Sequence, residues 1–182
     1  MKNKSLSNIN FVVIFALMVA ISVVLQKITF GTPITQVGLG FIGTALMGRF
    51  FGPVWAGIGA GLADVLNSII LGVLGGFYPG FTLSAIATGV IYGLFLYRQH
   101  LADNWKNGWR IIASVLVVTV VVYMVMNTLW ITHMTNGNFA HLFGIRLPKQ
   151  LILPWIQMLI LMIITIALDR VKIESILNRY SK

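Results

Sequence analysis

The chain has 182 residues, of which 58% are hydrophobic and only 9% are charged, and its mean hydropathy is +0.90. A soluble domain carries roughly 25% charged residues, so this composition excludes a soluble globular protein and predicts an integral membrane protein. The net charge of +9 does not indicate nucleic-acid binding, because the basic residues lie between apolar runs and form no continuous phosphate-binding surface.

Six apolar runs are long enough to cross a bilayer, whose hydrocarbon core takes about 20 residues of α-helix or somewhat fewer beside an inward-dipping loop. In chain order they are Ile9–Ile28, Val37–Phe51, Pro53–Gly72, Phe81–Tyr97, Ile111–His133 and Gln150–Leu168. The second run is short and contains glycine, so we expect it to be buried among the other helices. No polar segment is long enough to fold separately, so we predict an all-α membrane protein, residues 1–182, with six transmembrane helices in one compact bundle.

The basic residues predict the orientation of this bundle. Six spans place both termini on one side of the membrane, and loops rich in Lys and Arg face the cytoplasm. Cytoplasmic termini leave only three basic residues outside, namely Lys27, Arg146 and Lys149. The other ten then lie inside: Lys2, Lys4, Arg49, Arg98, Lys106, Arg110, Arg170, Lys172, Arg179 and Lys182. The sequence therefore predicts cytoplasmic N- and C-termini.

Asp64, in the third run, is the only acidic residue inside a predicted span. A carboxylate at membrane depth is costly unless it is paired or lines a polar cavity. Asn67 lies about one turn further along, so we expect both side chains to face an outward-opening pocket. A salt bridge from Asp64 to Lys27, near the outer end of the first helix, is the alternative, and the two arrangements can coexist. Gln26, next to Lys27 in the first helix, lies at the same level as this pocket and is a further candidate binding residue.

The outer segment GGFYPGFTLSA, residues 75–85, is uncharged and rich in aromatic side chains. We expect it to form a rigid gate over the pocket, with Pro79 fixing a turn and Gly76 and Gly80 permitting it. Three aromatic side chains would then pack on a ligand: Phe77, Tyr78 and Phe81. A neutral turn with interfacial aromatic residues is the alternative.

The fifth run ends in MNTLWITH, which brings Asn127, Trp130 and His133 roughly into line at a spacing of three residues. An amide in hydrocarbon must find partners, so Asn127 is a candidate binding residue. Trp130 is either a stacking surface or a headgroup-level anchor. His133 has no second metal ligand nearby, so we expect it to be a polar binding residue or a solvated helix end rather than part of a metal site.

The sixth run begins with Gln150, and Pro154 is expected to kink its outer end so that Gln150, Trp155 and Gln157 face the same cavity. The preceding segment, Met134–Lys149, mixes turn residues with apolar ones. It suits either a short helix or lid over the mouth of the bundle or an interfacial helix resting on headgroups.

The inventory of polar groups does not indicate an enzyme. The chain has no cysteine, no nucleophile paired with a base and no cluster of carboxylates. A few placed polar groups among aromatic side chains suit a flat heterocyclic ligand, through stacking and directed hydrogen bonds.

The chain resembles the substrate-binding S-components of energy-coupling-factor vitamin transporters, and in detail the folate-specific ones. The resemblance lies in the size, the six spans, the AxxxA element Ala16–Ala20, and FGPVWAGIGAGLADVL followed by GGFYPGFTLSAIATGVIYGLFLY, residues 51–97. It implies a bacterial cell-membrane subunit that binds folate and works with a coupling membrane protein and two ATPases. No P-loop occurs in the sequence, in keeping with hydrolysis of ATP by another chain. No cofactor is implied.

The resemblance also implies roles for the candidate residues. Members of the family are thought to topple in the membrane, and Ala16 and Ala20 would slide on the coupling protein. The aromatic side chains would stack on the pterin, Asp64 or Asn67 would accept its paired donor edge, and the basic residues outside would neutralise the glutamate tail.

Three other functions stay open at this stage. The chain suits an S-component for another vitamin such as pantothenate or a pyridoxine-like compound, an intramembrane enzyme acting on lipids, or a purely structural assembly subunit.

Overall fold

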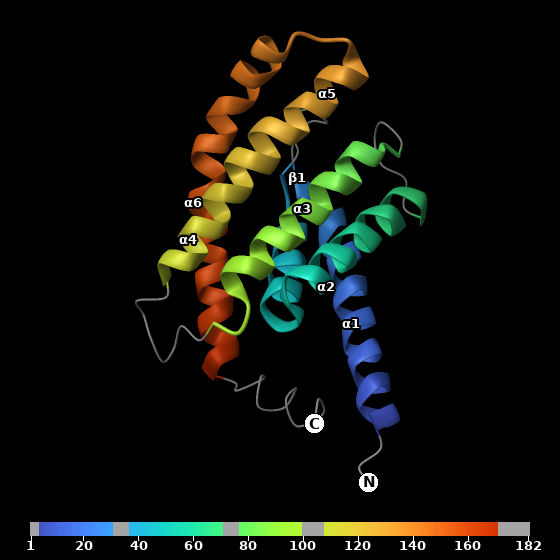
Figure 1. The fold of residues 1–182 in the computed structure, drawn as a ribbon. Coiled ribbons are helices and arrows are strands. Elements are labelled where there is room, and N and C mark those ends of the chain that lie inside the picture. The colour runs from blue at the N-terminus through green and yellow to red at the C-terminus, as the bar shows by residue number, and fades with distance from the viewer. Residues whose placement is uncertain (1–3, 31–36, 71–76, 100–107, 171–182) are drawn as a thin grey trace.

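The computed structural model describes residues 4–30, 37–70, 77–99 and 108–170, and in this part of the chain it is helical apart from one short two-stranded ribbon (Figure 1). The elements in chain order are α1 (Lys4–Lys27), β1 (Thr29–Phe30), β2 (Val37–Gly38), α2 (Gly40–Ile70), α3 (Pro79–Leu96), α4 (Gly108–Val117), the π-helix η2 (Val118–Met126), α5 (Asn127–Thr135) and α6 (Phe139–Arg170). The antiparallel ribbon pairs Thr29 with Gly38 and Phe30 with Val37.

Four helical stretches in the described residues are long and apolar enough to cross a membrane: Gly40–Ile69, Pro79–Leu96, Gly108–Thr135 and Phe139–Asp169. A shorter apolar stretch, Phe11–Lys27, belongs to α1. In Figure 1, α1 begins and α6 ends at the lower end of the molecule, while the turn from α5 to α6 lies at the upper end. The number of membrane crossings and the side that faces the cytoplasm stay predictions.

A kink divides α2 into two arms at the position where the sequence predicts two separate spans. Gly52 has φ +83°, a backbone conformation that favours glycine, and Pro53 cannot donate a backbone hydrogen bond. The ring of Tyr97 packs where a Cβ at residue 52 would lie, at 3.3 Å. Most residues of the first arm are buried, as the sequence analysis expected for the second apolar run.

Close packing joins α2 to α3. A Cβ added at Gly89 would lie 2.3 Å from the carbonyl oxygen of Ala56, and one added at Gly93 would lie 2.3 Å from the Cα of Pro53. Glycine in these two positions therefore lets the backbones of the two helices touch.

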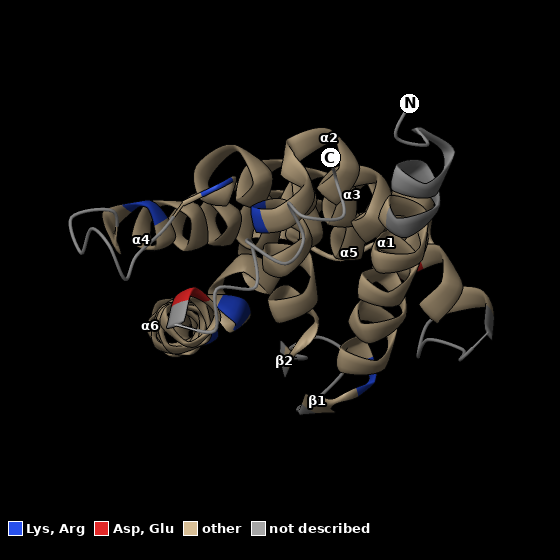
Figure 2. Cartoon of the chain, turned by 90° about the horizontal axis from the view of Figure 1, so that it is seen from below, with Lys and Arg blue, Asp and Glu red and all other residues tan. Residues whose placement is uncertain are grey.

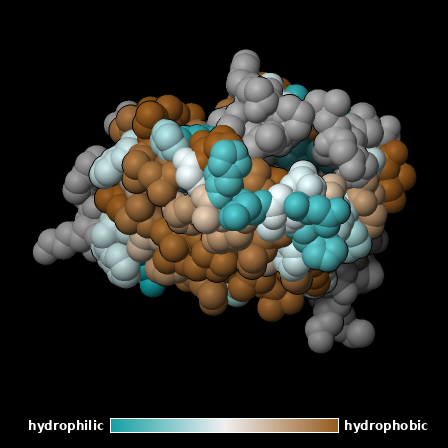
Figure 3. All heavy atoms as spheres, turned by 90° about the horizontal axis from the view of Figure 1, so that it is seen from above, coloured by the Kyte–Doolittle hydropathy of each residue, from teal (hydrophilic) through white to brown (hydrophobic). Residues whose placement is uncertain are grey.

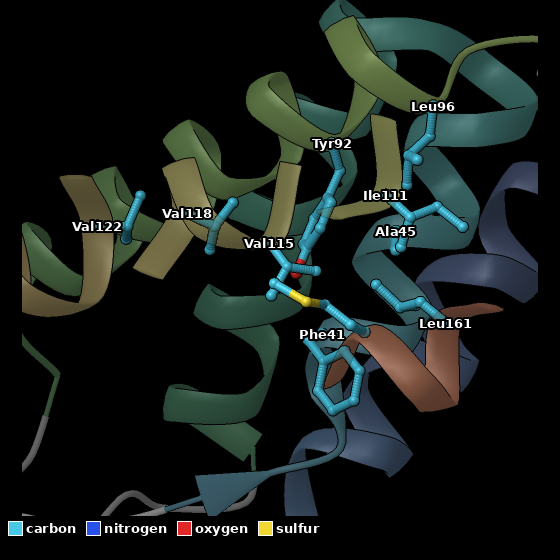
Figure 4. Close-up of a cluster of buried hydrophobic side chains, with 10 residues drawn as sticks. Phe41, Ala45, Tyr92, Leu96, Ile111, Val115, Val118, Val122 and Leu161 are labelled. Atoms are coloured by element: carbon cyan, nitrogen blue, oxygen red, sulfur yellow. The ribbon is translucent and has the colours of Figure 1, made fainter. Parts of the chain in front are cut away.

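Two buried apolar clusters lie on either side of α2. The larger one, with Tyr92 at its centre, gathers side chains from α2, α3, α4, η2 and α6 (Figure 4). The smaller one joins Val19 of α1 to Met47 and three alanines of α2. Apolar side chains also cover the flanks, and hydrophilic residues gather on the upper face (Figure 3). Exposed apolar flanks suit a bilayer environment.

A buried ion pair joins α2 to the end of α6 at the lower end of the molecule, which Figure 2 views directly. Arg49 donates to the carboxylate of Asp169 and to the backbone carbonyl oxygen of Thr165, at 3.2 Å for the latter. Both charged side chains are almost fully buried, at 3% and 2% exposed. The sequence predicts for Arg49 only a place among the basic residues on the cytoplasmic side, and not this ion pair.

Two predictions about the segments that flank the apolar runs were wrong. The sixth helix begins at Phe139 rather than at Gln150, and it continues through Pro148 and Pro154. Most of the segment Met134–Lys149 is therefore the first part of α6, preceded by the end of α5, and not a separate lid or interfacial helix. Of the expected gate, residues 75 and 76 lie outside the described residues, and Pro79 begins α3.

Candidate ligand-binding site

The candidate site is built around the first turns of α3, where side chains from α2 and α5 meet it. The hydroxyl of Thr82 donates a hydrogen bond of 2.7 Å to Oδ2 of Asp64. Asp64 is half-buried, two turns before the end of α2. One carboxylate oxygen is thus held by α3, and the hydrogen bond supplies a partner that a carboxylate at membrane depth requires.

Four rings form an aromatic cluster beside this carboxylate: Tyr78, Phe81, Trp130 and His133. The ring of Tyr78 lies 5.8 Å from that of Phe81, 6.1 Å from that of Trp130 and 6.4 Å from that of His133, measured between centroids. The hydroxyl oxygen of Tyr78 is 3.4 Å from Nδ1 of His133. Such tilted and edge-to-face arrangements are the favoured geometry for ring pairs.

Trp130 is held against α3 at two points. Its indole N–H donates a hydrogen bond of 3.0 Å to Oγ of Ser84, which is buried. One turn earlier, a Cβ at Gly80 would lie 2.6 Å from the indole Cδ2. Gly80 therefore makes room for the ring of the tryptophan. The prediction that Gly80 permits a turn was wrong, because Gly80 lies within α3 and does not have a positive φ.

On the other side of α5, a buried arginine of α6 contacts the same helix. Nη1 of Arg146 donates a hydrogen bond of 3.2 Å to Oγ1 of Thr128. Arg146 is 6% exposed and Thr128 is fully buried. In the part of the chain that the structure describes, no carboxylate pairs with this buried guanidinium, which is costly in a protein interior, so its place suits an anionic ligand group.

Several buried polar atoms of the described residues make no hydrogen bond within that part of the chain. Five of them come from α2, α5 and α6, namely Asn67 Oδ1, Asn127 Oδ1, Arg146 Nε, Gln150 Oε1 and Gln157 Oε1, and the other two are Ser22 Oγ of α1 and Tyr92 Oη of α3. An unsatisfied buried polar atom costs about 1–3 kcal/mol, and native structures contain few of them. Four of the five residues are candidates from the sequence, and Gln157 was named with them as a possible wall of the cavity.

The structure does not bring all the candidates together. Trp155 is 66% exposed, whereas Gln150 and Gln157 are buried on the opposite side of α6, so the prediction that the three share a cavity was wrong for Trp155. Phe77 precedes α3 and is half exposed. Gln26, at the end of α1, packs against the start of α2, where a Cβ at Gly40 would lie 2.5 Å from its Cγ. Lys27 ends the same helix.

Two residues of the site escaped the sequence analysis, Thr82 and Ser84. Most hydroxyls in the apolar helices bond backward to their own helix, as Thr88 does to the carbonyl oxygen of Ser84. Thr82 and Ser84 instead bond side chains of other helices. The only signal in the sequence is their spacing of two residues, which directs them to different neighbours.

Comparison with known proteins identifies the family. The family model described as "ECF transporter, substrate-specific component" matches residues 10–168. The chain belongs to this family. The predicted relationship is thereby confirmed, and so is the prediction that the chain is a transporter subunit rather than an enzyme.

Individual relatives extend along most of the chain. A protein of Clostridium novyi (strain NT), "Folate transporter FolT", is 33% identical over 178 residues, which are 97% of this chain and 100% of that protein. A "Folate transporter FolT" of Leuconostoc mesenteroides is 31% identical over 150 residues, 80% of this chain and 78% of the relative.

A solved structure shares the fold. The "Crystal structure of FolT bound with folic acid" superposes with a TM-score of 0.76 at 32% identity, and the match covers 85% of this chain and 91% of that one. The all-helical arrangement is therefore that of an S-component.

Proposed function

We propose that the chain binds folate at the outer face of a bacterial cell membrane and delivers it to the cytoplasm together with a transmembrane coupling protein and two ATPase subunits. The observation that carries the proposal is the 33% identity, over 97% of the chain, to a protein named as a folate transporter. The likeness in fold to FolT bound with folic acid supports the same ligand.

The geometry of the site suits the pterin end of folate. A pterin is flat, and the aromatic cluster offers ring faces for stacking, with Trp130 held rigidly by Ser84. The pterin also carries a paired N–H donor edge. Thr82 occupies Oδ2 of Asp64, so Oδ1 is the oxygen we assign to this edge. Asn67 adds a further acceptor one turn along α2.

The basic residues suit the other end of folate, which is a dianionic glutamate. Arg146 is buried and directs its guanidinium at α5, where Asn127 and Thr128 lie. Lys149 is one turn further along α6, and Lys27 ends α1. We assign the glutamate to Arg146 first, because a guanidinium binds a carboxylate through two parallel hydrogen bonds.

A titration of the purified protein with folate, followed by tryptophan fluorescence, tests the proposal. We expect saturable quenching with a dissociation constant well below micromolar. Trp130→Phe should remove most of the quenching, whereas Trp155→Phe, on the exposed side of α6, should leave it unchanged. Saturable binding of pantothenate or pyridoxine with no response to folate would contradict the proposal.

Asp64→Asn tests the acceptor role in the same assay. The amide keeps the size of the side chain and one oxygen but loses the charge, so a charge-assisted bond of about 1.5–3 kcal/mol weakens. We expect folate affinity to fall at least about tenfold, since 1.4 kcal/mol corresponds to a factor of ten. An unaltered dissociation constant would assign Asp64 a structural role only.

The partner assignment rests on Ala16 and Ala20, which are exposed on α1. Small side chains permit close approach of another helix. Ala16→Trp should preserve folate binding and abolish uptake into cells that supply the other subunits, whereas Leu94→Trp, at a position that is also exposed but lies on α3, should preserve both. Normal uptake by Ala16→Trp would overturn the assignment.

A further inference from the structure

One continuous helical stretch runs from Gly108 to Thr135, and its middle third is not an α-helix. Residues Val118–Met126 form the π-helix η2 between α4 and α5. π-Helical segments are rare, usually only one turn long, and frequent at functional sites. Here the segment comes directly before Asn127, Thr128 and Trp130.

The burial pattern changes face across this segment. Leu129 follows Ile111 by eighteen residues, about five turns of a regular α-helix, so the two side chains would lie on the same face. Ile111 is 1% exposed but Leu129 is 46% exposed. Val125 is likewise 44% exposed, while Thr128 is fully buried. The helix after η2 is thus rotated relative to the helix before it.

The size of this rotation follows from the geometry of the turns. A turn holds 3.0 residues with i→i+3 bonds and 3.6 with i→i+4 bonds, and a π-helical turn with i→i+5 bonds holds about 4.4. The nine residues of η2 therefore complete about two turns. An α-helix completes two turns in about seven residues, so η2 carries about two surplus residues and rotates α5 by nearly half a turn.

Without this rotation the polar residues of α5 would face the wrong way. Asn127 follows Ile111 by sixteen residues, about four and a half turns, so a regular α-helix would direct it away from the buried face. Instead its Oδ1 is buried. Thr128 meets Arg146 of α6, and Trp130 meets Ser84 of α3.

We propose that η2 is a positioning element, a two-residue insertion that directs Asn127, Thr128 and Trp130 into the ligand site. The ligand-binding part of this inference rests on the proposed function. The composition of η2, VTVVVYMVM, favours such a departure, because β-branched residues stabilise an α-helix less than leucine or alanine do. Val120, Val121 and Val125 of this segment are exposed, so an extra residue among them disturbs few packing contacts.

Two deletions in η2 test the proposal, since they have opposite consequences. Val120 and Val121 are 52% and 44% exposed and make no polar contact. Deleting Val121 alone rotates α5 by about 100°, whereas deleting both leaves a seven-residue, two-turn α-helix that restores the native direction. We expect the single deletion to lower folate affinity at least about tenfold, and the double deletion to bind within about threefold of the parent. Deletion of Gly137, exposed in the turn after α5, is the control and should leave affinity unchanged.

A second readout reports the rotation without folate. The chain has no cysteine, so Ser84→Cys with Trp130→Cys places the only two thiols in the molecule on α3 and α5. A short bifunctional thiol reagent should join them in the parent and in the double deletion, but not in the single deletion. If the parent binds no folate, the proposed function fails, and this cross-linking pattern still decides the role of η2.

The outcomes that overturn the proposal are specific. A single deletion that keeps both the cross-link and the affinity would show that η2 does not set the direction of α5. A double deletion that is folded but loses the cross-link, or one that does not fold at all, would do the same. If only the single deletion fails to fold, the double deletion alone gives the result.

Discussion

Replacing Gly89 by alanine tests the contact that fixes α3 on α2. The new Cβ would lie 2.3 Å from the carbonyl oxygen of Ala56, 2.6 Å from its carbonyl carbon and 2.9 Å from the backbone nitrogen of Gly57. Ordinary contact begins at 3.4 Å, and all three atoms are backbone, so the helices must separate by about 1 Å. Overpacking of this kind costs about 1–3 kcal/mol, against about 1 kcal/mol gained from the helix propensity of alanine.

Gly144→Ala is the matched control. A Cβ at Gly144, inside α6, meets no atom within 4 Å, so this variant should gain the propensity term alone. The difference in unfolding free energy between the two variants isolates the packing cost, which we expect to be about 1–3 kcal/mol. Thermal unfolding in detergent, followed by loss of the monodisperse gel-filtration peak, measures the order of stability.

The result that would refute the close α2–α3 contact is equal stability of the two variants. The same variants extend to binding. Thr82 and Ser84 lie on α3 and hold Asp64 and Trp130, so a shift of α3 should also weaken folate binding by Gly89→Ala and not by Gly144→Ala.

Two further substitutions probe single contacts. Asp169→Asn should destabilise the protein by about 3–5 kcal/mol in the same unfolding assay, because it removes the carboxylate that pairs with the buried guanidinium of Arg49. Arg49→Met combined with Asp169→Leu should recover most of this loss. An unchanged unfolding temperature of the single variant would mean that the ion pair contributes nothing to stability. Thr82→Val keeps the shape of the side chain but removes the donor to Asp64, so folate affinity should fall about fivefold. Thr82→Ser keeps the hydroxyl, so its affinity should stay near that of the parent. Equal affinities of Thr82→Val and the parent in the fluorescence titration would exclude a positioning role for the hydroxyl.

The helices could be predicted wherever the apolar runs have clear ends. The kink of α2 at Gly52 and Pro53 and the start of α3 near Pro79 follow from local chemistry, since proline and glycine interrupt or begin helices for reasons of their own backbone. The start of α6 did not follow. Residues 139–149 contain basic and proline residues and resemble a loop, yet the helix holds Arg146 on its buried side through a contact with α5. That contact is tertiary, and no local pattern reveals it.

The sequence predicts which residues form the candidate site better than it predicts how their side chains are arranged. Asp64, Asn127 and Gln150 are polar residues in apolar runs, and the cost of burying them identifies them without any structure. Their partners depend on the rotation of each helix. The prediction put Trp155 on the wrong face because it assumed a kink at Pro154. The helix continues through Pro154, and at 3.6 residues per turn Trp155 then lies opposite Gln150 and Gln157.

The π-helix marks the limit of this kind of prediction. A run such as VVTVVVYMV is apolar on every face, so its hydrophobic periodicity carries no information about helical rotation. Two surplus residues in such a run leave the prediction of a membrane-spanning helix intact while turning everything after them by nearly half a turn. The sequence therefore identifies the candidate side chains after this run but does not predict the direction in which they point.

The two halves of the site are supported by elements of unequal rigidity. Asp64 and Thr82 belong to α2 and α3, whose backbones touch at Gly89, so neither helix can move without the other. Trp130 belongs to α5, which is joined to the rest of its helix through η2, a segment with weaker local preference for its conformation. A ligand that stacks on Trp130 and bonds Asp64 would link α5, whose position can adjust through η2, to the closely packed pair α2 and α3. Closure of the site on folate should therefore appear as movement of α5 relative to an unmoved α2–α3 pair, and the spacing between labels at residues 94 and 129, both exposed, would report it in the presence and absence of folate.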